Sequence, residues 1–203
     1  MSAAAFLSVW LIHLLAAVSP GPSFVVSLRV AASQGFGAAA ALAFGFGVGA
    51  FLWAVAALAG LALLFETVPQ LFVALKWIGG AFLIFIGVMM WKHSADPMPK
   101  AEAVNVQSKT SAFRLGLTTF MTNPKTSVFF GAVFAGLIPP EAPLWALACV
   151  VGIIFLNETI WYLLVARVFS LPAPRAAYTR AKTWVDRTFG TLIALFGVKI
   201  ALS

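Results

Sequence analysis

Three ionisable side chains, Lys125, Glu158 and His13, lie inside long apolar stretches of this sequence. A lysine at the centre of a membrane span costs roughly 2.5–3.5 kcal/mol on insertion scales, so it has to face a cavity or a partner. We expect Lys125 to attract a substrate carboxylate or to assist proton coupling. The alternative is an ion pair that holds two helices together.

Glu158 is the acid that we place deep in a span, next to Asn157. A carboxyl group there can carry a proton, bind a substrate ammonium or form a static pair with Lys125. His13 is a second candidate for proton coupling because imidazole changes charge near physiological pH. A histidine in a span more often packs and hydrogen-bonds, and that alternative stays open. Asn157 joins these two residues as a candidate for proton coupling.

Two proline motifs interrupt apolar runs, Ser19-Pro20-Gly21-Pro22 and Thr122-Asn123-Pro124-Lys125. Proline has no backbone N–H and clashes with the preceding helical turn, so each motif frees carbonyl groups from the helical ladder. Inside a membrane such a break has to face protein or a watery cavity. The motifs therefore predict a solute-binding site, against the alternative of a structural kink without a ligand. The predicted site comprises Ser19, Pro20, Gly21, Pro22, Asn123, Pro124 and Lys125.

The composition places these motifs in a membrane. Of the 203 residues, 62% are hydrophobic and 9% are charged, and the mean hydropathy is +1.01. A soluble domain is usually about one quarter charged. The chain has room for roughly six spans of about 20 residues and for no separate soluble domain. We expect one transmembrane domain over residues 1–203, with spans near 6–28, 38–64, 71–91, 113–136, 145–166 and 184–202.

The basic residues predict how these spans are oriented. The net charge of +7 would suggest nucleic acid in a soluble protein, but here the bases gather in a few loops. The first, third and fifth loops hold ten of the 13 Lys and Arg residues. The positive-inside rule places those loops in the cytoplasm and both termini in the periplasm. Because no base precedes Arg29, we expect the first segment to be a span and not a cleaved signal peptide.

The spans divide into halves of three, over about 1–91 and 113–203, joined by a polar cytoplasmic loop at 92–112. Because three is odd, the second half enters the membrane from the opposite side. The predicted fold is therefore an all-α membrane protein of two inverted three-helix repeats. In secondary transporters of this plan the solute site lies near the midplane, where helices of both halves break.

Other classes of protein fit the sequence less well. An intramembrane hydrolase using Ser19 and His13 would need residues that lie on poorly matched helix faces. A transition-metal transporter would favour several His, Cys or carboxylate ligands in the spans, and Cys149 is the single cysteine. A membrane scaffold has no use for a buried Lys and Glu. We expect a transporter of small molecules surrounded by lipid, without enzymatic activity, metal, cofactor or nucleic acid.

The sequence resembles the LysE/RhtB family, the lysine-exporter and homoserine/threonine-efflux group, over essentially its whole length. The matching segments are Ser19-Pro20-Gly21-Pro22, then Gly35-Phe36-Gly37, Phe120-Met121-Thr122-Asn123-Pro124-Lys125, Trp161-Tyr162, and the last span with Gly190 and Gly197. The resemblance implies export of amino acids or their derivatives across the bacterial inner membrane by alternating access, driven by proton exchange. It also implies homodimers and a transport site built on the paired proline motifs. The role of Glu158 rests on its depth in the span and not on the family.

Overall fold

The computed structural model describes residues 1–203 except 20, 68–69, 98–105, 135–136, 139–140 and 203, and gives only the backbone for the rest of 61–73, for 75–76 and for 132–133. This part of the chain is helical and contains no strand. The elements are α1 (Ala3–Val18), α2 (Pro22–Thr67), α3 (Gln70–Lys92), α4 (Lys109–Met121), α5 (Pro124–Val128), the π-helix η1 (Phe129–Phe134), α7 (Leu144–Phe169) and α8 (Pro172–Leu202).

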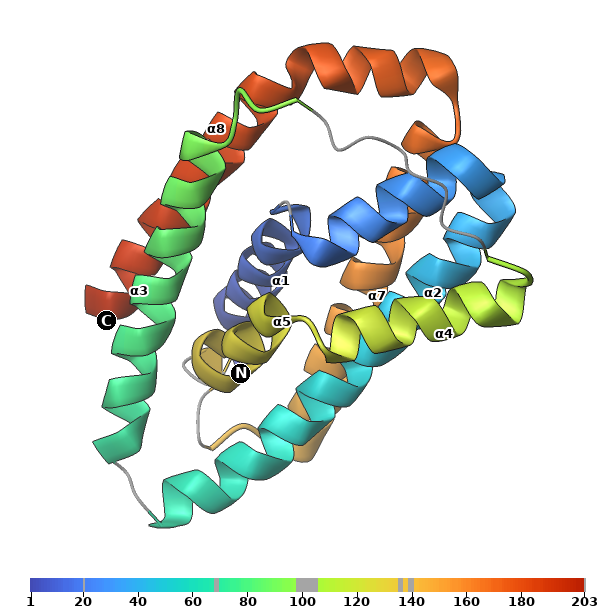
Figure 1. Ribbon diagram of the computed structural model, residues 1–203. Helices are drawn as coiled ribbons and strands as arrows, with labels where there is room; N and C mark the ends of the chain where they lie inside the picture. The colour runs from blue at the N-terminus through green and yellow to red at the C-terminus, as the bar shows by residue number, and fades with distance from the viewer. Residues whose placement is uncertain (20, 68–69, 98–105, 135–136, 139–140, 203) are drawn as a thin grey trace.

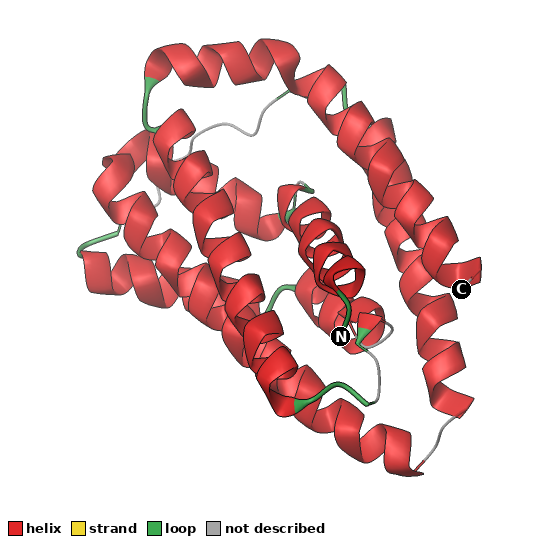
Figure 2. Cartoon of the chain, turned by 180° about the vertical axis from the view of Figure 1, so that it is seen from behind, coloured by secondary structure: helices red, strands yellow, loops and turns green. Residues whose placement is uncertain are grey.

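The helices form two groups (Figure 1 and Figure 2). Helix α2 packs against both α4 and α7, while α3 and α8 lie side by side along most of their length. Helices α1 and α5 lie between these groups, together with η1, which contacts α3. The central segments therefore have neighbours in both groups.

Glycines bring α3 and α8 into backbone contact. A Cβ atom added to Gly80 would lie 2.7 Å from the carbonyl oxygen of Gly197, and one added to Gly197 would lie 2.6 Å from that of Gly80. Gly87 and Gly190 make the equivalent contact one heptad away. The numbering rises along one helix as it falls along the other, so the helices are antiparallel. Small residues are what allow membrane helices to approach so closely.

The predicted first span over 6–28 is broken at its proline motif, as the sequence indicates. Helix α1 ends at Val18, and α2 begins at Pro22. The proline motif interrupts the helix because it removes hydrogen-bond donors that the ladder needs. The chain then stays helical up to a sharp turn at Gly35, where φ is 80° and ψ is −177°. This left-handed conformation favours glycine, and it marks the predicted turn between the first two spans.

Two other helices begin earlier than predicted. Helix α4 starts at Lys109 because the side chains of Ser108 and Ser111 cap each other's backbone N–H groups. Helix α8 starts at Pro172, so part of the second polar stretch is helical. Its prolines fall in the first turn, where a backbone N–H has no helical partner anyway. Figure 1 shows that this first part of α8 runs across one end of the molecule before the helix bends toward the C-terminus.

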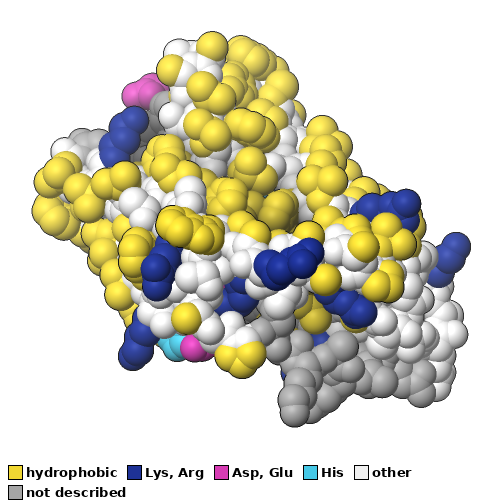
Figure 3. Space-filling view, turned by 90° about the horizontal axis from the view of Figure 1, so that it is seen from above, with side chains coloured by type: hydrophobic (Ala, Val, Ile, Leu, Met, Phe, Trp, Pro, Cys, Tyr) yellow, Lys and Arg dark blue, Asp and Glu magenta, His cyan; other side chains and the backbone are white. Residues whose placement is uncertain are grey.

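The apolar character of the molecule is visible on its surface. Two described segments, Pro22–Gly60 and Leu144–Phe169, are long and apolar enough to cross a membrane, and Ala3–Val18 and Trp77–Lys92 are shorter apolar segments. Large apolar side chains such as Leu144 are exposed. Figure 3 looks down on the end where α3 stops and α8 starts, and shows Lys and Arg side chains among apolar ones. The count of six spans stays a prediction.

Candidate functional site

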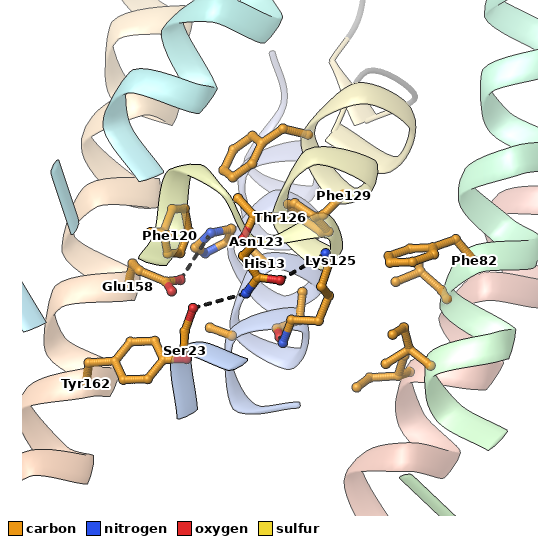
Figure 4. A pocket seen from close by; sticks show the side chains of 16 residues that line it. His13, Ser23, Phe82, Phe120, Asn123, Lys125, Thr126, Phe129, Glu158 and Tyr162 are labelled. Atoms are coloured by element: carbon orange, nitrogen blue, oxygen red, sulfur yellow. Dashed lines mark hydrogen bonds and ion pairs between the residues drawn. The ribbon is translucent and has the colours of Figure 1, made fainter. Parts of the chain in front are cut away.

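A cavity lies where the central segments meet α3, α7 and α8 (Figure 4). Its volume is about 30 Å³, which is room for no more than a few water molecules. Pockets for small molecules usually measure about 300–1,000 Å³, so this cavity is contracted in the conformation seen. Its polar wall consists of His13, Ser23, Asn123, Lys125, Thr126, Glu158 and Tyr162.

Lys125 closes the end of α1. Its Nζ donates hydrogen bonds to the carbonyl oxygens of Ala16, at 3.0 Å, and of Ser19, at 2.7 Å. In a continuous helix the carbonyl of Ala16 would accept from the backbone N–H of residue 20, and position 20 is a proline without that group. The ammonium group replaces the missing donor. It also places a positive charge at the C-terminal end of a helix, which carries partial negative charge.

Asn123 links the two proline motifs. Its Oδ1 accepts from the backbone N–H of Lys125 at 3.0 Å and so caps α5, whose first residue is Pro124. An asparagine before a proline at the first helical position is a favourable helix start. Its Nδ2 donates to Oγ of Ser23 at 3.0 Å, in the first turn of α2. Ser23 and Tyr162 of α7 line the same cavity.

The residues of the first motif differ in their positions. Gly21 lies against Lys125, because a Cβ atom added to it would be 3.4 Å from Nζ. Ser19 contributes its carbonyl oxygen to Lys125, although its side chain does not line this cavity. Pro22 begins α2 and Pro20 lies outside the described residues. The structure thus brings Gly21, Asn123 and Lys125 together, while Pro22 and Pro124 shape the backbone.

A second polar cluster lies between α1 and α7. It consists of His13 of α1 and of Asn157 and Glu158 of α7. Nδ2 of Asn157 donates to the carbonyl of Trp10 at 3.1 Å and lies 3.1 Å from Nδ1 of His13. Because an amide N–H is a donor, Nδ1 accepts and the imidazole proton is on Nε2. That atom lies 3.6 Å from Oε2 of Glu158. All three side chains are buried.

The two ionisable side chains Lys125 and Glu158 have different partners in the structure. Glu158 lies against His13, whereas Lys125 donates to backbone carbonyls, so a direct ion pair between Lys125 and Glu158 is not the arrangement seen. Both side chains nevertheless line one cavity (Figure 4). Their roles in substrate binding and proton transfer stay predictions.

Much of the wall is apolar, and no pattern in the sequence predicts it. The ring of Phe129 packs edge-on against the His13 ring at 5.5 Å between centroids, and it begins the π-helix η1. Short π-helical segments occur frequently at functional sites. In a sequence that is apolar throughout, nothing distinguishes such residues from those that face lipid. The apolar wall consists of Ala16, Ala17, Phe82, Leu83, Ile86, Phe120, Phe129, Phe130 and Ile193.

Among the described residues, no group of three or more His, Cys, Asp or Glu side chains is placed so that it could hold a metal ion.

Comparisons with known proteins agree on one family. The sequence model described as LysE type translocator matches residues 14–203. The threonine efflux protein of Escherichia coli (strain K12) is 32% identical over 202 residues, which cover 98% of each chain. The homoserine/homoserine lactone efflux protein of Salmonella typhi is 28% identical over 200 residues, which cover 95% of each chain. No solved structure matches the chain significantly. With its apolar helices the chain is an inner membrane protein, and it belongs to the LysE type translocator family.

Proposed function

We propose that this protein exports an amino acid or a small amino-acid derivative across the inner membrane, with the contracted central cavity as its substrate site. The observation that carries the proposal is the position of Lys125, which comes from one helix break and closes the other inside that cavity. The same wall holds Glu158. A cation and an acid in one cavity match the carboxylate and ammonium groups of an amino acid.

The substrate class is supported by the relatives, which are named threonine efflux protein and homoserine/homoserine lactone efflux protein. Lys125 has three N–H donors, and two of them are used by the carbonyls of Ala16 and Ser19. The third remains for a substrate carboxylate. A substrate that attracts the ammonium group more strongly would also loosen the end of α1, which ties binding to the conformation of the break.

Alternating access by two inverted halves is the mechanism that we infer from the contacts. The first helix of each half, α1 in one and α4 in the other, ends at a proline motif, so the breaks occupy corresponding places in the two halves. Helix α1 of the first half contacts α7 of the second, and α4 of the second half contacts α2 of the first. The antiparallel pair of α3 and α8 then relates the third helices of the two halves.

Proton coupling is the role that we assign to His13 and Glu158. Nε2 of His13 lies 3.6 Å from Oε2 of Glu158, a distance that a small movement would shorten to a hydrogen bond. A proton carried by this pair from the periplasm would change the charge of the wall that faces the substrate. Substrate release and proton uptake would thereby compete at one cavity.

The test is an efflux assay in cells that overexpress the chain, screened across threonine, homoserine, lysine and toxic analogues. We expect the wild-type protein to export at least one neutral amino acid and an uncoupler to stop that export. Lys125→Ala should abolish it at equal membrane abundance, with Lys199→Ala near the C-terminus as the matched control. Wild-type efflux by Lys125→Ala would contradict the role given to the lysine.

Proton coupling has its own test. Glu158→Gln keeps the size of the side chain and removes its charge, so we expect exchange of labelled amino acid down its gradient to persist while uncoupler-sensitive export is lost. Purified protein in liposomes with an imposed pH gradient makes the measurement. Export that still follows the pH gradient in Glu158→Gln would rule this carboxyl group out as the proton carrier.

The orientation and assembly complete the proposal. Lys and Arg side chains gather at the end where α3 stops and α8 begins (Figure 3), which favours a cytoplasmic position for that end. Both termini would then be periplasmic. Labelling of single cysteines placed at Ser2 and at Ser203 with a membrane-impermeant maleimide should occur in intact cells. A homodimer is the expected assembly, and light scattering of the detergent-purified protein measures it.

A further inference from the structure

A second and larger cavity lies beside the first helix break. Its volume is about 330 Å³, within the usual range for small-molecule pockets. It opens between the start of α2, the end of α3 and the polar part of α8. We call it the vestibule. Its wall includes Ser19, Phe24, Ile86, His93, Tyr178 and Asp186.

Two buried oxygen atoms belong to vestibule residues and have no hydrogen-bond partner. Oγ of Ser19 is one, on a residue with 0% exposure, and Oδ1 of Asp186 is the other, on a residue with 2% exposure. Leaving a buried polar atom unpaired costs about 1–3 kcal/mol, and more for a charged group. Native structures contain few such atoms. Both residues line the vestibule, and a polar ligand there would supply the partners that these two atoms lack.

Lys182 fixes the character of that ligand. Its Nζ donates to Oδ2 of Asp186 at 2.7 Å, to the carbonyl of His93 at 3.1 Å and to that of Ser94 at 3.2 Å. All three of its donors are thereby used. The lysine anchors the end of α3 and holds one carboxylate oxygen in place. The other oxygen, Oδ1, is left as an acceptor, and it suits a cationic N–H donor.

The vestibule adjoins the central cavity. Ile86 lines both cavities. Ser19 lines the vestibule, and its carbonyl oxygen accepts the hydrogen bond from Lys125. A molecule in the vestibule would therefore contact Ser19, the residue whose carbonyl oxygen Lys125 binds at the first break. In this conformation the vestibule has room for a small molecule and the central cavity does not.

We infer that the vestibule is a separate site that binds the primary ammonium group of the exported molecule before it reaches the central cavity. Oδ1 of Asp186 accepts from the ammonium group, and Oγ of Ser19 hydrogen-bonds the carboxylate. This rests on the proposed export of amino acids and on the orientation that places the end of α3 in the cytoplasm. The vestibule would be the first site that the substrate contacts, ahead of the two helix breaks.

The test separates the two faces of the membrane. In everted vesicles the cytoplasmic face is outside, so export of labelled L-threonine is measured as uptake. Right-side-out vesicles measure binding from the periplasmic face by counterflow of the same label. We expect Asp186→Asn to raise the KM from the cytoplasmic face about tenfold, which corresponds to one lost charge-assisted hydrogen bond. Ser19→Ala should raise it about threefold. Neither variant should change the KM from the periplasmic face.

Ser27→Ala is the matched control, because Ser27 is also fully buried with an unpartnered hydroxyl but lines neither cavity. Its KM should equal that of the wild type. An equal rise in Ser27→Ala, or an unchanged cytoplasmic KM in Ser19→Ala, overturns the vestibule site. If Asp186→Asn does not reach the membrane, Ser19→Ala alone decides. Failure of the wild type to transport any amino acid would instead count against the proposed function.

Discussion

The carbonyl oxygens of Ala16 and Phe120 lose the same partner, because a proline follows each of them four residues later. At the second break the chain supplies its own substitute, since the backbone N–H of Asn123 donates to the carbonyl of Phe120 at 3.3 Å. At the first break the substitute comes from the other half, as Nζ of Lys125. One break is satisfied by its own backbone, and the other depends on a side chain from the other half.

This difference assigns different tasks to the two breaks. A break capped by its own backbone is a fixed platform, and Asn123 is the residue that makes it one. A break held by a lysine can be released by anything that competes for the ammonium group. We propose that substrate binding is coupled to the first break.

Asn123→Ala should disturb both breaks at once. It removes the cap of α5 and the hydrogen bond to Ser23, at a combined cost of about 2–3 kcal/mol. Asn123→Asp keeps the capping oxygen and should recover part of the loss. Thermal unfolding of the purified proteins in detergent measures the stability, and efflux measures function. Equal stability of Asn123→Ala and the wild type would show that the second break does not rely on its cap.

Gly21→Leu should act on the first break alone. A Cβ atom at this position already lies 3.4 Å from Nζ of Lys125, so a larger side chain has to displace the ammonium group from its carbonyl partners. We expect a loss of about 2 kcal/mol in stability and a matching loss of efflux, whereas Gly21→Ala should be mild. Gly152→Leu, where an added Cβ meets nothing within 4 Å, is the control. Normal efflux by Gly21→Leu would show that export does not need the contact between Lys125 and the first break.

Ser23→Ala should have the smallest effect. It removes the acceptor of the Asn123 amide, which is worth about 1 kcal/mol of stability. Ser27→Ala removes a buried hydroxyl that has no partner, so it should cost nothing measurable. The two melting temperatures, measured side by side, make the comparison. A loss of the same size in both variants would mean that the link between the motifs contributes no stability.

Both breaks were predictable from the sequence because proline acts locally and its effect does not depend on the fold. Lys125 was predictable as a candidate because a charge in an apolar run is visible without a structure. The partner of that charge was not predictable, because backbone carbonyls are present at every position. The early start of α8 was missed since the polar stretch before it looked like a loop. Its prolines in fact stand where a helix tolerates them.

The cluster of His13, Asn157 and Glu158 was predicted as three separate candidates, and only the packing of α1 against α7 brings them together. The apolar part of the cavity wall was not predictable. Phe82 and Phe129 cannot be told from lipid-facing residues in the sequence, because the protein core and the lipid are equally apolar. In soluble proteins the alternation of polar and apolar faces would have separated them.

The paired glycines of α3 and α8 have a mechanical consequence. Two rods that touch backbone to backbone at Gly80 and Gly197, and again at Gly87 and Gly190, cannot slide past each other without losing both contacts. A movement of the pair would therefore be a tilt of both helices together. Ile86 lies between the two glycine contacts of α3 and borders both cavities. A tilt that widened the cavity on one side of Ile86 would narrow the other, which is the exclusion that the proposed alternating access requires.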